Sequence, residues 1–269
     1  MQTVKATHVN LDPQRRAFYS GTLKLLNESK VDYLVGGAYA FARYTGIERD
    51  TKDFDIFVRP KDCARILEVL KSSGCETELT FPHWLGKAYC GEDFFDVIYS
   101  SGNAVAEVDD EWFENAVDGI VLDVPVKLCP AEEIIWSKAF VMERERYDGA
   151  DIAHLLRACA TDLDWHRLLR RFGQQWRVLL SHLVLFGFAY PAERNQIPNF
   201  VLDNLLQRLQ NEMHTAPPTE RVCQGTLISR AQYLIDLERW GYQDSRLKPR
   251  GKMSKEEITH WTLAISKEK

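Results

Sequence analysis

The sequence predicts an α+β fold in which a mixed sheet flanked by helices is followed by an all-helical C-terminal region. Up to about residue 128, short runs rich in β-branched and aromatic residues alternate with helical patterns. From Pro130 onward the patterns are helical. Hydrophobic residues make up 45% of the 269 residues and charged residues 27%, as in ordinary globular proteins. We therefore expect an α/β domain over residues 1–128 and a helical domain over residues 129–269.

The first domain is expected to begin with a helix. Asp12 precedes Pro13, which fits the first helical position, and the helix should run to about Ser29. The other expected elements are strands over 33–35, 54–58, 94–99 and 120–126, and helices over 38–44 and 60–74. Strands and helices in this order predict a sheet that is covered by helices.

The helical domain is expected to begin at Pro130, with Glu132 and Glu133 in the first turn. Further helices are predicted over 149–160, 163–172, 175–189, 198–213, 224–239 and 254–266, with a loop over 242–252. The apolar run 178–190 is too short to span a bilayer and contains His182. We interpret this run as a buried helix, and no membrane partner is expected.

Charge is distributed unevenly along the chain. Residues 1–160 contain 18 Lys and Arg against 27 Asp and Glu, whereas residues 161–269 contain 16 against 12. An acidic domain suits the binding of cations, and a mildly basic one suits a polyanionic acceptor. The alternative is that these charges are scattered over solvated surfaces.

The cysteines show no pattern of a metal site, since none are at CxxC spacing and none cluster with histidines. They are Cys63, Cys75, Cys90, Cys129, Cys159 and Cys223. We expect all six to be reduced thiols. The first ten residues lack the apolar stretch of a signal peptide. Both observations favour a cytoplasmic location.

Two acids in the second expected strand carry the first chemical signal. Asp53 and Asp55 alternate with Phe54 and Ile56, so the two carboxylates should share one face while the apolar side chains enter the core. Neighbouring carboxylates repel each other unless a cation lies between them. Hard divalent ions such as Mg²⁺ prefer oxygen ligands. The pair therefore predicts a metal site; the alternative is a solvated strand end.

Asp96 is the best candidate for a third ligand. It lies in an otherwise apolar and aromatic strand, where Phe95, Val97 and Tyr99 should face the side opposite to it. An acid in a buried strand is costly unless it is paired or bound to metal. The alternative is a core acid that is satisfied by a backbone group or an arginine.

A double glycine, Gly36-Gly37, follows the first expected strand and precedes a helix. Glycine lets the backbone approach a phosphate closely, and the N-terminus of a helix favours an anion. Such a pair is often only a turn, but here it precedes the acid pair and the third acid.

These motifs together resemble the DNA polymerase beta-like nucleotidyltransferase superfamily. Its mark is a strand, a Gly-Gly or Gly-Ser turn, a short helix, and Asp-x-Asp on the next strand. The form Arg49-x-Thr51-x-Asp53-x-Asp55 is similar to that of small bacterial members. The segment with Pro130, Glu132, Glu133, Lys138, Arg144, Asp148 and Asp151 is similar to toxin-like and abortive-infection members. The resemblance covers residues 30–160.

The resemblance implies a role for each matching residue. Asp53 and Asp55 would hold two Mg²⁺ ions on a nucleoside triphosphate, and Asp96 would complete the metal site and help to deprotonate the acceptor hydroxyl. The residues implied to bind the nucleotide are Gly36, Gly37, Arg49, Thr51 and Lys138. The two glycines would cradle phosphates, the two cations would neutralise them, and Thr51 would bond the phosphate or the strand turn.

Several of these residues have simpler interpretations. Arg49 could be a surface cation, and Lys138 could extend along Trp136 to solvent. Asp148 and Asp151 could cap a helix and pair with Arg144 or Arg146. His83 and Lys87, in a loop with Phe81, Pro82 and Trp84, could contact the acceptor or the base, although a structural histidine is the simpler alternative.

The predicted function is Mg²⁺-dependent transfer of a nucleoside monophosphate from an NTP to an acceptor hydroxyl, with release of pyrophosphate. RNA, a protein and a small molecule are all open as acceptors, and the basic C-terminal region slightly favours RNA. One alternative is a catalytically silent nucleotide-binding module that regulates a complex. Another is a hydrolase with the same metal geometry. The sequence does not identify the base, the oligomeric state or a role in a toxin or defence system.

Overall fold

The computed structural model describes residues 11–264, which form parts of two compact units, Met1–Pro130 and Ala131–Lys269. Residues 1–10 and 265–269 lie outside the described residues. The first ten residues, on which the absence of a signal peptide was predicted, and the end of the helix predicted over 254–266 are therefore not described. We describe each unit by itself.

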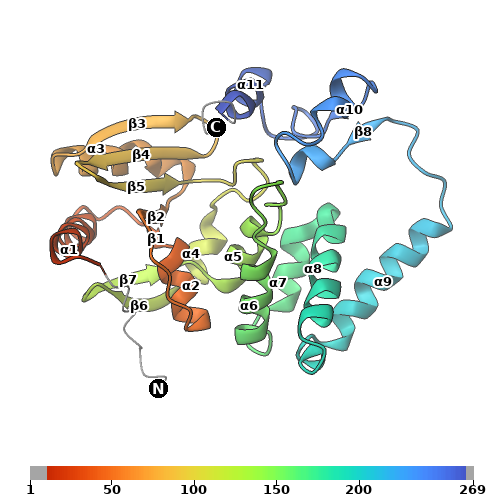
Figure 1. Cartoon of the computed structure of the whole chain (residues 1–269), viewed down its shortest axis with the longest axis horizontal. Helices are drawn as coiled ribbons and strands as arrows, with labels where there is room; N and C mark the ends of the chain where they lie inside the picture. The colour runs from red at the N-terminus through yellow and green to blue at the C-terminus, as the bar shows by residue number, and fades with distance from the viewer. Residues whose placement is uncertain (1–10, 265–269) are drawn as a thin grey trace. The chain divides into compact units, whose positions relative to one another are not determined.

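A seven-stranded mixed sheet forms the centre of the N-terminal unit (Figure 1). In chain order its strands are β1 (Leu34–Val35), β2 (Asp53–Phe57), β3 (Glu76–Phe81), β4 (Leu85–Cys90), β5 (Asp93–Ile98), β6 (Val117–Val121) and β7 (Val124–Leu128). Their order in the sheet is β3-β4-β5-β2-β1-β7-β6. Strand β2 runs parallel to β5, and β1 runs parallel to β7, whereas the other neighbours are antiparallel. The predicted α+β fold with a mixed sheet is confirmed.

Helices pack against this sheet. They are α1 (Pro13–Glu28), α2 (Gly37–Thr45), α3 (Cys63–Ser72) and the short α4 (Asp110–Glu114). The side chain of Asp12 caps α1 by accepting from two backbone N–H groups, as its place before Pro13 predicts. Tyr19 of α1 is fully buried and packs on the rings of Phe54 and Phe95. This aromatic cluster fixes which face of the sheet is the core.

Two hairpins differ from the prediction. The hairpin of β3 and β4 was not predicted, and the single strand expected over 120–126 is wrong, because β6 and β7 turn back at Leu122 and Asp123. These two residues have positive φ angles of 48° and 64°. Hairpin turns of this kind favour Asn and Gly, so a turn made by Leu and Asp leaves the sequence looking like one continuous strand.

The prediction of six reduced thiols is wrong for one pair. Cys75 and Cys90 form a disulfide with 4.5 Å between their Cα atoms. Cys75 directly precedes Glu76, whose partner in the ladder is Tyr89, so the two cysteines lie opposite each other at the end of the β3–β4 pairing. Their separation of 15 residues resembles no motif, and the contact depends on a hairpin that was not predicted. The other four cysteines are free and buried.

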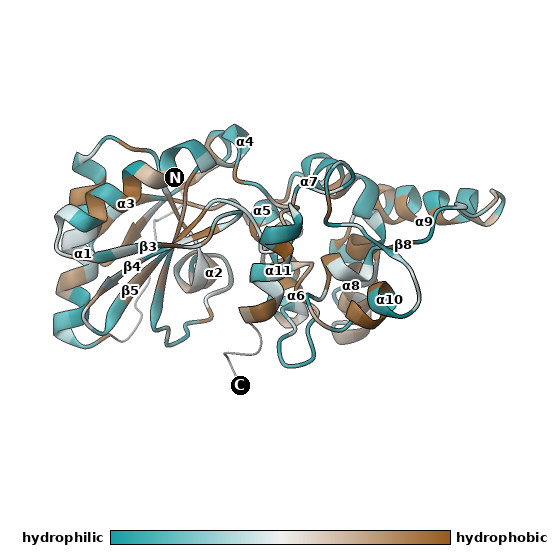
Figure 2. Cartoon of the chain, turned by 90° about the horizontal axis from the view of Figure 1, so that it is seen from above, coloured by the Kyte–Doolittle hydropathy of each residue, from teal (hydrophilic) through white to brown (hydrophobic). Residues whose placement is uncertain are grey.

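The C-terminal unit is built mainly of helices. They are α5 (Ala131–Lys138), α6 (Gly149–Cys159), α7 (Trp165–Phe172), α8 (Trp176–Ala189), α9 (Asn199–Met213), α10 (Leu234–Glu238) and α11 (Lys255–Leu263). The long α9 mixes hydrophobic and hydrophilic residues along its length (Figure 2). It buries Val201 and Leu205 while Phe200 and Leu206 stay exposed, so an apolar residue in this helix is not always a core residue.

Beyond α9 the unit departs from the helical prediction. A single helix over 224–239 is wrong, because this segment contains a short 3-10 turn (Gly225–Leu227) and only the five residues of α10. The region is also not purely helical, since the two-residue strands β8 (Val222–Cys223) and β9 (Gln243–Asp244) pair in parallel.

The apolar run over 178–190 forms α8, but only one of its faces is buried. Leu179, His182 and Phe186 are buried, whereas Val184 and Phe188 are 62% and 84% exposed. The prediction of a buried helix therefore holds for one face of α8 only. Among the described residues, no helix is long and apolar enough to cross a membrane.

An ion cluster that the sequence did not reveal joins α5 to α7. Glu132 and Glu133, expected simply to suit the first turn of a helix, are both buried. Glu132 pairs with Arg167 at 2.6 Å, and Glu133 contacts Arg167 at 3.4 Å and Arg171 at 3.2 Å. Burial raises the pKa of Glu133 to about 7, against the opposing effect of the two arginines. Buried charges with partners of this kind specify how the two helices meet.

His182 gives the C-terminal unit a predicted dependence on pH. Its ring Nε2 lies 2.9 Å from the Ala139 carbonyl oxygen, and burial lowers its pKa from the ordinary 6.5. Below pH 6.5 the unfolded chain takes up a proton that the folded unit binds less readily, so the free energy of unfolding should fall as the pH decreases. The loss should continue down to the folded pKa, at about 1.4 kcal/mol for each unit between the two pKa values.

Denaturant unfolding between pH 5 and pH 8 measures this effect. In the variant His182→Gln, the free energy of unfolding should fall less steeply below pH 6.5 than in the wild type. His214→Gln is the matched control, because His214 is exposed at the end of α9. An equal slope in the wild type and in His182→Gln would contradict the prediction.

Candidate active site

Three acids from two neighbouring strands meet on one face of the N-terminal sheet. Asp53 and Asp55 lie on β2, and Asp96 lies on β5. Strands β2 and β5 are parallel, and Asp55 is the direct partner of Asp96 in their register. One carboxylate oxygen from each of the three acids lies within 4.8 Å of the others. The structure thus brings together the three residues that the sequence analysis singled out as metal ligands.

Alternation along the strands explains why the acids point away from the core. Phe54, Ile56, Phe95 and Val97 are 0% exposed, whereas the three acids are only partly buried. Burial raises the pKa of Asp96 above its ordinary value, and the charge of Asp53 acts in the same direction, while Lys87 opposes the shift. Three carboxylates therefore gather on this face of the sheet, with the ammonium of Lys87 beside Asp96.

The double glycine lies beside Asp55. The backbone N–H of Gly36 donates to the Asp55 carbonyl oxygen at 3.0 Å, and Gly37 begins α2. Gly37 has a φ of 51°, and a Cβ atom on it would lie 2.7 Å from Asp55 Cγ and would overlap Oδ2. A Cβ atom on Gly36 would overlap the Phe57 ring, lying 2.6 Å from its Cδ2 atom and closer still to Cε2. These glycines are thus required by close packing against β2, besides any contact with phosphate.

Thr51 forms a hydrogen bond with Asp53, one of the three acids. Its hydroxyl donates to Asp53 Oδ1 and also lies 3.1 Å from the Asp53 carbonyl oxygen. The guanidinium of Arg49 lies 4.4 Å from the centre of the Phe41 ring. Thr51 therefore orients Asp53. Arg49 lies against the ring of Phe41 in α2, the helix that begins at Gly37. Their contact with a nucleotide remains a prediction.

Lys138 lies in the C-terminal unit, at the end of α5. Its ammonium pairs with Asp148 and Asp151, each at 2.9 Å, and Arg146 also pairs with Asp148 at 3.1 Å. The sequence predicts Arg144 or Arg146 as the partner of these two acids. Arg146 does pair with Asp148, but Lys138, which was not predicted as a partner, pairs with both acids. The role of Lys138 in nucleotide binding remains a prediction.

His83 and Lys87, the two residues of the 81–87 segment that the sequence offers as contacts for the acceptor or the base, both have protein partners. His83 Nε2 lies 3.0 Å from the Gly102 carbonyl oxygen, which favours the structural interpretation. Lys87 donates to Asp96 Oδ1 at 2.6 Å and therefore reaches the acid cluster itself. No local signal in the sequence marks this contact, because it depends on the pairing of β4 with β5.

The donor set fits a hard divalent cation. Three carboxylates converge from one face, and no sulfur or imidazole ligand is among them, which is the chemistry that Mg²⁺ selects. Close carboxylates repel one another, and a bound cation relieves that repulsion. Next to them, the start of α2 offers backbone N–H groups to an anion. Such a site can hold a metal complex of a nucleoside triphosphate.

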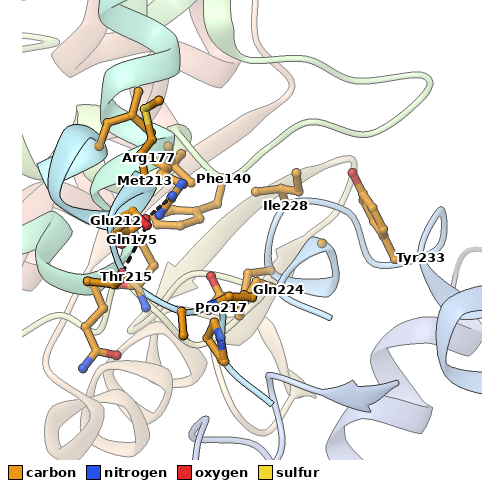
Figure 3. Close-up of a pocket in the computed structure, with 17 residues that line it drawn as sticks. Phe140, Gln175, Arg177, Glu212, Met213, Thr215, Pro217, Gln224, Ile228 and Tyr233 are labelled. Atoms are coloured by element: carbon orange, nitrogen blue, oxygen red, sulfur yellow. Dashed lines mark hydrogen bonds and ion pairs between the residues drawn. The ribbon is translucent and has the colours of Figure 1, made fainter. Parts of the chain in front are cut away.

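A separate pocket lies within the C-terminal unit (Figure 3). It has a volume of about 880 Å³ and lies between α8, α9 and the segment that follows α9. Arg177 and Glu212 form an ion pair in it, and Phe140 and Tyr233 are among its apolar lining residues. The three clustered acids of the N-terminal unit do not line it.

Part of the N-terminal unit is similar to a known protein family. Residues 20–86 match the family model described as aminoglycoside-2''-adenylyltransferase. This segment contains the Gly36-Gly37 turn and both acids of β2. Over this segment the chain is similar to that adenylyltransferase family. The match ends before Asp96 and Lys138, so the roles of these two residues in nucleotide transfer, and the likeness to a toxin-like branch, remain predictions.

Solved structures that are similar to this chain share little sequence identity with it. The solution structure of the antibiotic-resistance factor ANT(2'')-Ia shares 18% identity, with a TM-score of 0.46, and the alignment covers 64% of this chain and 98% of that one. Lincomycin-bound LnuA, a lincosamide antibiotic adenylyltransferase, shares 16% identity at a TM-score of 0.39, covering 55% and 98%. An antigenic nucleotidyltransferase-like protein from Paracoccidioides brasiliensis shares 17% at 0.41, covering 67% and 90%. No curated protein matches the sequence.

Proposed function

We propose that this chain transfers a nucleoside monophosphate from an Mg²⁺-bound NTP to a hydroxyl of a small molecule of the aminoglycoside class. The observation that carries the proposal is the meeting of Asp53, Asp55 and Asp96 beside the glycine turn. Most of this arrangement lies in the segment that matches an aminoglycoside adenylyltransferase family. An acid cluster next to a helix N-terminus is suited to a metal-bound triphosphate.

Each residue of the site has a separate role in the proposed reaction. Asp53 and Asp55 would hold Mg²⁺, which when bound neutralises the triphosphate charge and orients the α-phosphate for attack. Asp96 accepts the proton of the acceptor hydroxyl while the acceptor oxygen forms a bond to the α-phosphorus. The bond from the α-phosphorus to the bridging oxygen breaks, and pyrophosphate leaves with that oxygen. Gly37 and the start of α2 bind the departing phosphates through backbone N–H groups.

The class of acceptor is inferred from the family match. The excess of basic residues in 161–269 favoured RNA by a narrow margin when the sequence was taken alone. The family model names an enzyme that adenylylates an aminoglycoside, which is a small polyhydroxylated amine. We therefore prefer a small molecule to RNA and ATP to the other nucleotides.

The test uses the purified full chain with each of four α-labelled NTPs and MgCl₂. Tobramycin, lincomycin, total RNA and a protein extract are offered as separate acceptors. We expect label from ATP on the aminoglycoside, together with one pyrophosphate for each product molecule. EDTA should stop both, because the acids need a divalent ion to bind the triphosphate.

Each other outcome identifies a competing function. Label on RNA or on protein would overturn the proposed acceptor class and leave the transferase chemistry intact. Free labelled NMP in every mixture would indicate a hydrolase. NTP binding by calorimetry without any product would favour the silent nucleotide-binding module.

A further inference from the structure

Lys87 lies between two acids and pairs with only one of them. On β4 its register partners are Asp96 of β5 on one side and Glu78 of β3 on the other. Its Nζ donates to Asp96 Oδ1 at 2.6 Å. Glu78 instead accepts from the hydroxyl groups of Tyr89, at 3.1 Å, and Thr80, at 2.9 Å. The lysine is thus directed toward the acid cluster.

The Lys87–Asp96 pair is held in a partly buried place. The lysine side chain is 19% exposed and that of Asp96 is 13% exposed. The ammonium also lies 4.5 Å from the centre of the Phe94 ring, close enough for a cation–π contact. Ion pairs that are shielded from water are stronger than surface pairs. Lys87 therefore has a defined position beside Asp96.

A row of paired residues across the sheet connects Lys87 to the acid cluster. Lys87 of β4 is opposite Asp96 of β5, which is opposite Asp55 of β2, whose carbonyl accepts from Gly36 beyond β1. The row thus begins with a positive charge and ends at the glycine turn. A carboxylate whose one oxygen is held by an ammonium has less negative charge to offer to a metal.

We infer that Lys87 is a positioning residue for Asp96: it binds one carboxylate oxygen, weakens Asp96 as a cation ligand, and keeps it available for the acceptor hydroxyl. This inference deepens the proposed function, on which its catalytic part rests. The geometry that carries it is the direct pairing of Lys87 Nζ with Asp96 Oδ1.

Binding of Mn²⁺ to the full chain, followed by electron paramagnetic resonance, tests the inference without any reaction. In Lys87→Met the freed Asp96 should bind the ion more fully, and the affinity should rise roughly tenfold, the size of one charge-assisted hydrogen bond. Lys87→Arg keeps the charge and should stay within about twofold of the wild type. Unchanged or weaker binding by Lys87→Met would overturn the inference.

Lys127→Met is the matched control. Lys127 of β7 pairs with Asp118, its register partner on β6, at 2.8 Å, so it is a second cross-strand Lys–Asp pair on the same sheet. Its side chain is 55% exposed, and Asp118 is not in the acid cluster. This variant should bind Mn²⁺ as the wild type does. A similar gain in both variants would show a general charge effect and would overturn the inference.

A double variant separates an effect through Asp96 from a direct effect on the ion. With Asp96→Asn in place, Lys87→Met should change the Mn²⁺ affinity by no more than about twofold, because interacting residues are not additive. An undiminished tenfold gain would show that Lys87 acts on the ion directly, which would overturn the positioning role.

Steady-state kinetics test the catalytic part. Lys87→Met should lower kcat by roughly 10- to 100-fold, since Asp96 is drawn to the metal and lost as a proton acceptor, with little change in KM for the nucleotide. Lys87→Arg should restore most of kcat. A rise in KM alone would show that Lys87 binds the nucleotide. If the Mn²⁺ results hold while no acceptor is labelled, the proposed function fails and the pairing role stands.

Discussion

Replacing Asp53 or Asp55 by Asn is expected to lower nucleotide transfer at least about a thousandfold, because the loss of a metal ligand removes several kcal/mol of charge stabilisation from the transition state. The two acids lie on one face of β2 with an oxygen of each within 4.8 Å of Asp96. A neutral amide cannot replace a carboxylate as a ligand for Mg²⁺. The measurement is the rate of label transfer from α-labelled ATP.

Folding should survive these substitutions, which makes the result interpretable. Asp53 and Asp55 are only partly buried, and their neighbours Phe54 and Ile56 form the core contacts. Removing one of three close negative charges relieves repulsion, so without metal the free energy of unfolding should be unchanged or slightly higher. Asp118→Asn is the matched control, because Asp118 is an exposed strand acid outside the cluster. Transfer by Asp53→Asn at more than a tenth of the wild-type rate would reject the metal site.

Replacing Gly37 by Ala is expected to lower transfer by roughly a hundredfold, which is the cost of a displacement of about 1 Å in an active site. The added Cβ would overlap Asp55 Oδ2 and lie 2.7 Å from Cγ. Either the carboxylate rotates away from the cluster or the start of α2 shifts. Both movements separate the metal ligand from the phosphate-binding turn.

Gly46→Ala is a close control at the other end of α2. Gly46 also has a positive φ, 72°, but a Cβ atom there would meet nothing within 4 Å. Both variants should therefore lose about 1–2 kcal/mol of stability from the left-handed backbone, and only Gly37→Ala should lose activity and Mn²⁺ affinity. Equal activity in the two variants would show that Gly37 is needed only for its left-handed backbone conformation and not for its close approach to Asp55.

The elements that local pattern defines were predictable. Asp12 and Pro13 begin α1, and alternation along β2 and β5 assigned the core faces of Phe54 and Phe95 correctly. The missed elements lack a local signal. The β6–β7 hairpin turns at Leu122 and Asp123 rather than at glycine, and most of 224–239 is irregular although its composition resembles that of a helix.

Partners that are far apart in sequence could not be predicted in the same way. Cys75 meets Cys90 because β3 and β4 form a hairpin, and the lysine at 138 pairs with Asp148 and Asp151 because α5 contacts α6. Each contact depends on which elements become neighbours. That choice depends on the packing of the whole unit, which no short window of sequence records.

The sequence by itself determined which acids could bind a metal, because strand alternation places Asp53 and Asp55 on one face and makes an acid at Asp96 conspicuous among apolar neighbours. Only the tertiary structure decided that β5 lies beside β2 with Asp96 opposite Asp55, and that β4 brings Lys87 to the same carboxylate. The physical reason is that side-chain direction follows from the backbone period of a single strand, whereas strand order and register follow from the burial of the whole sheet.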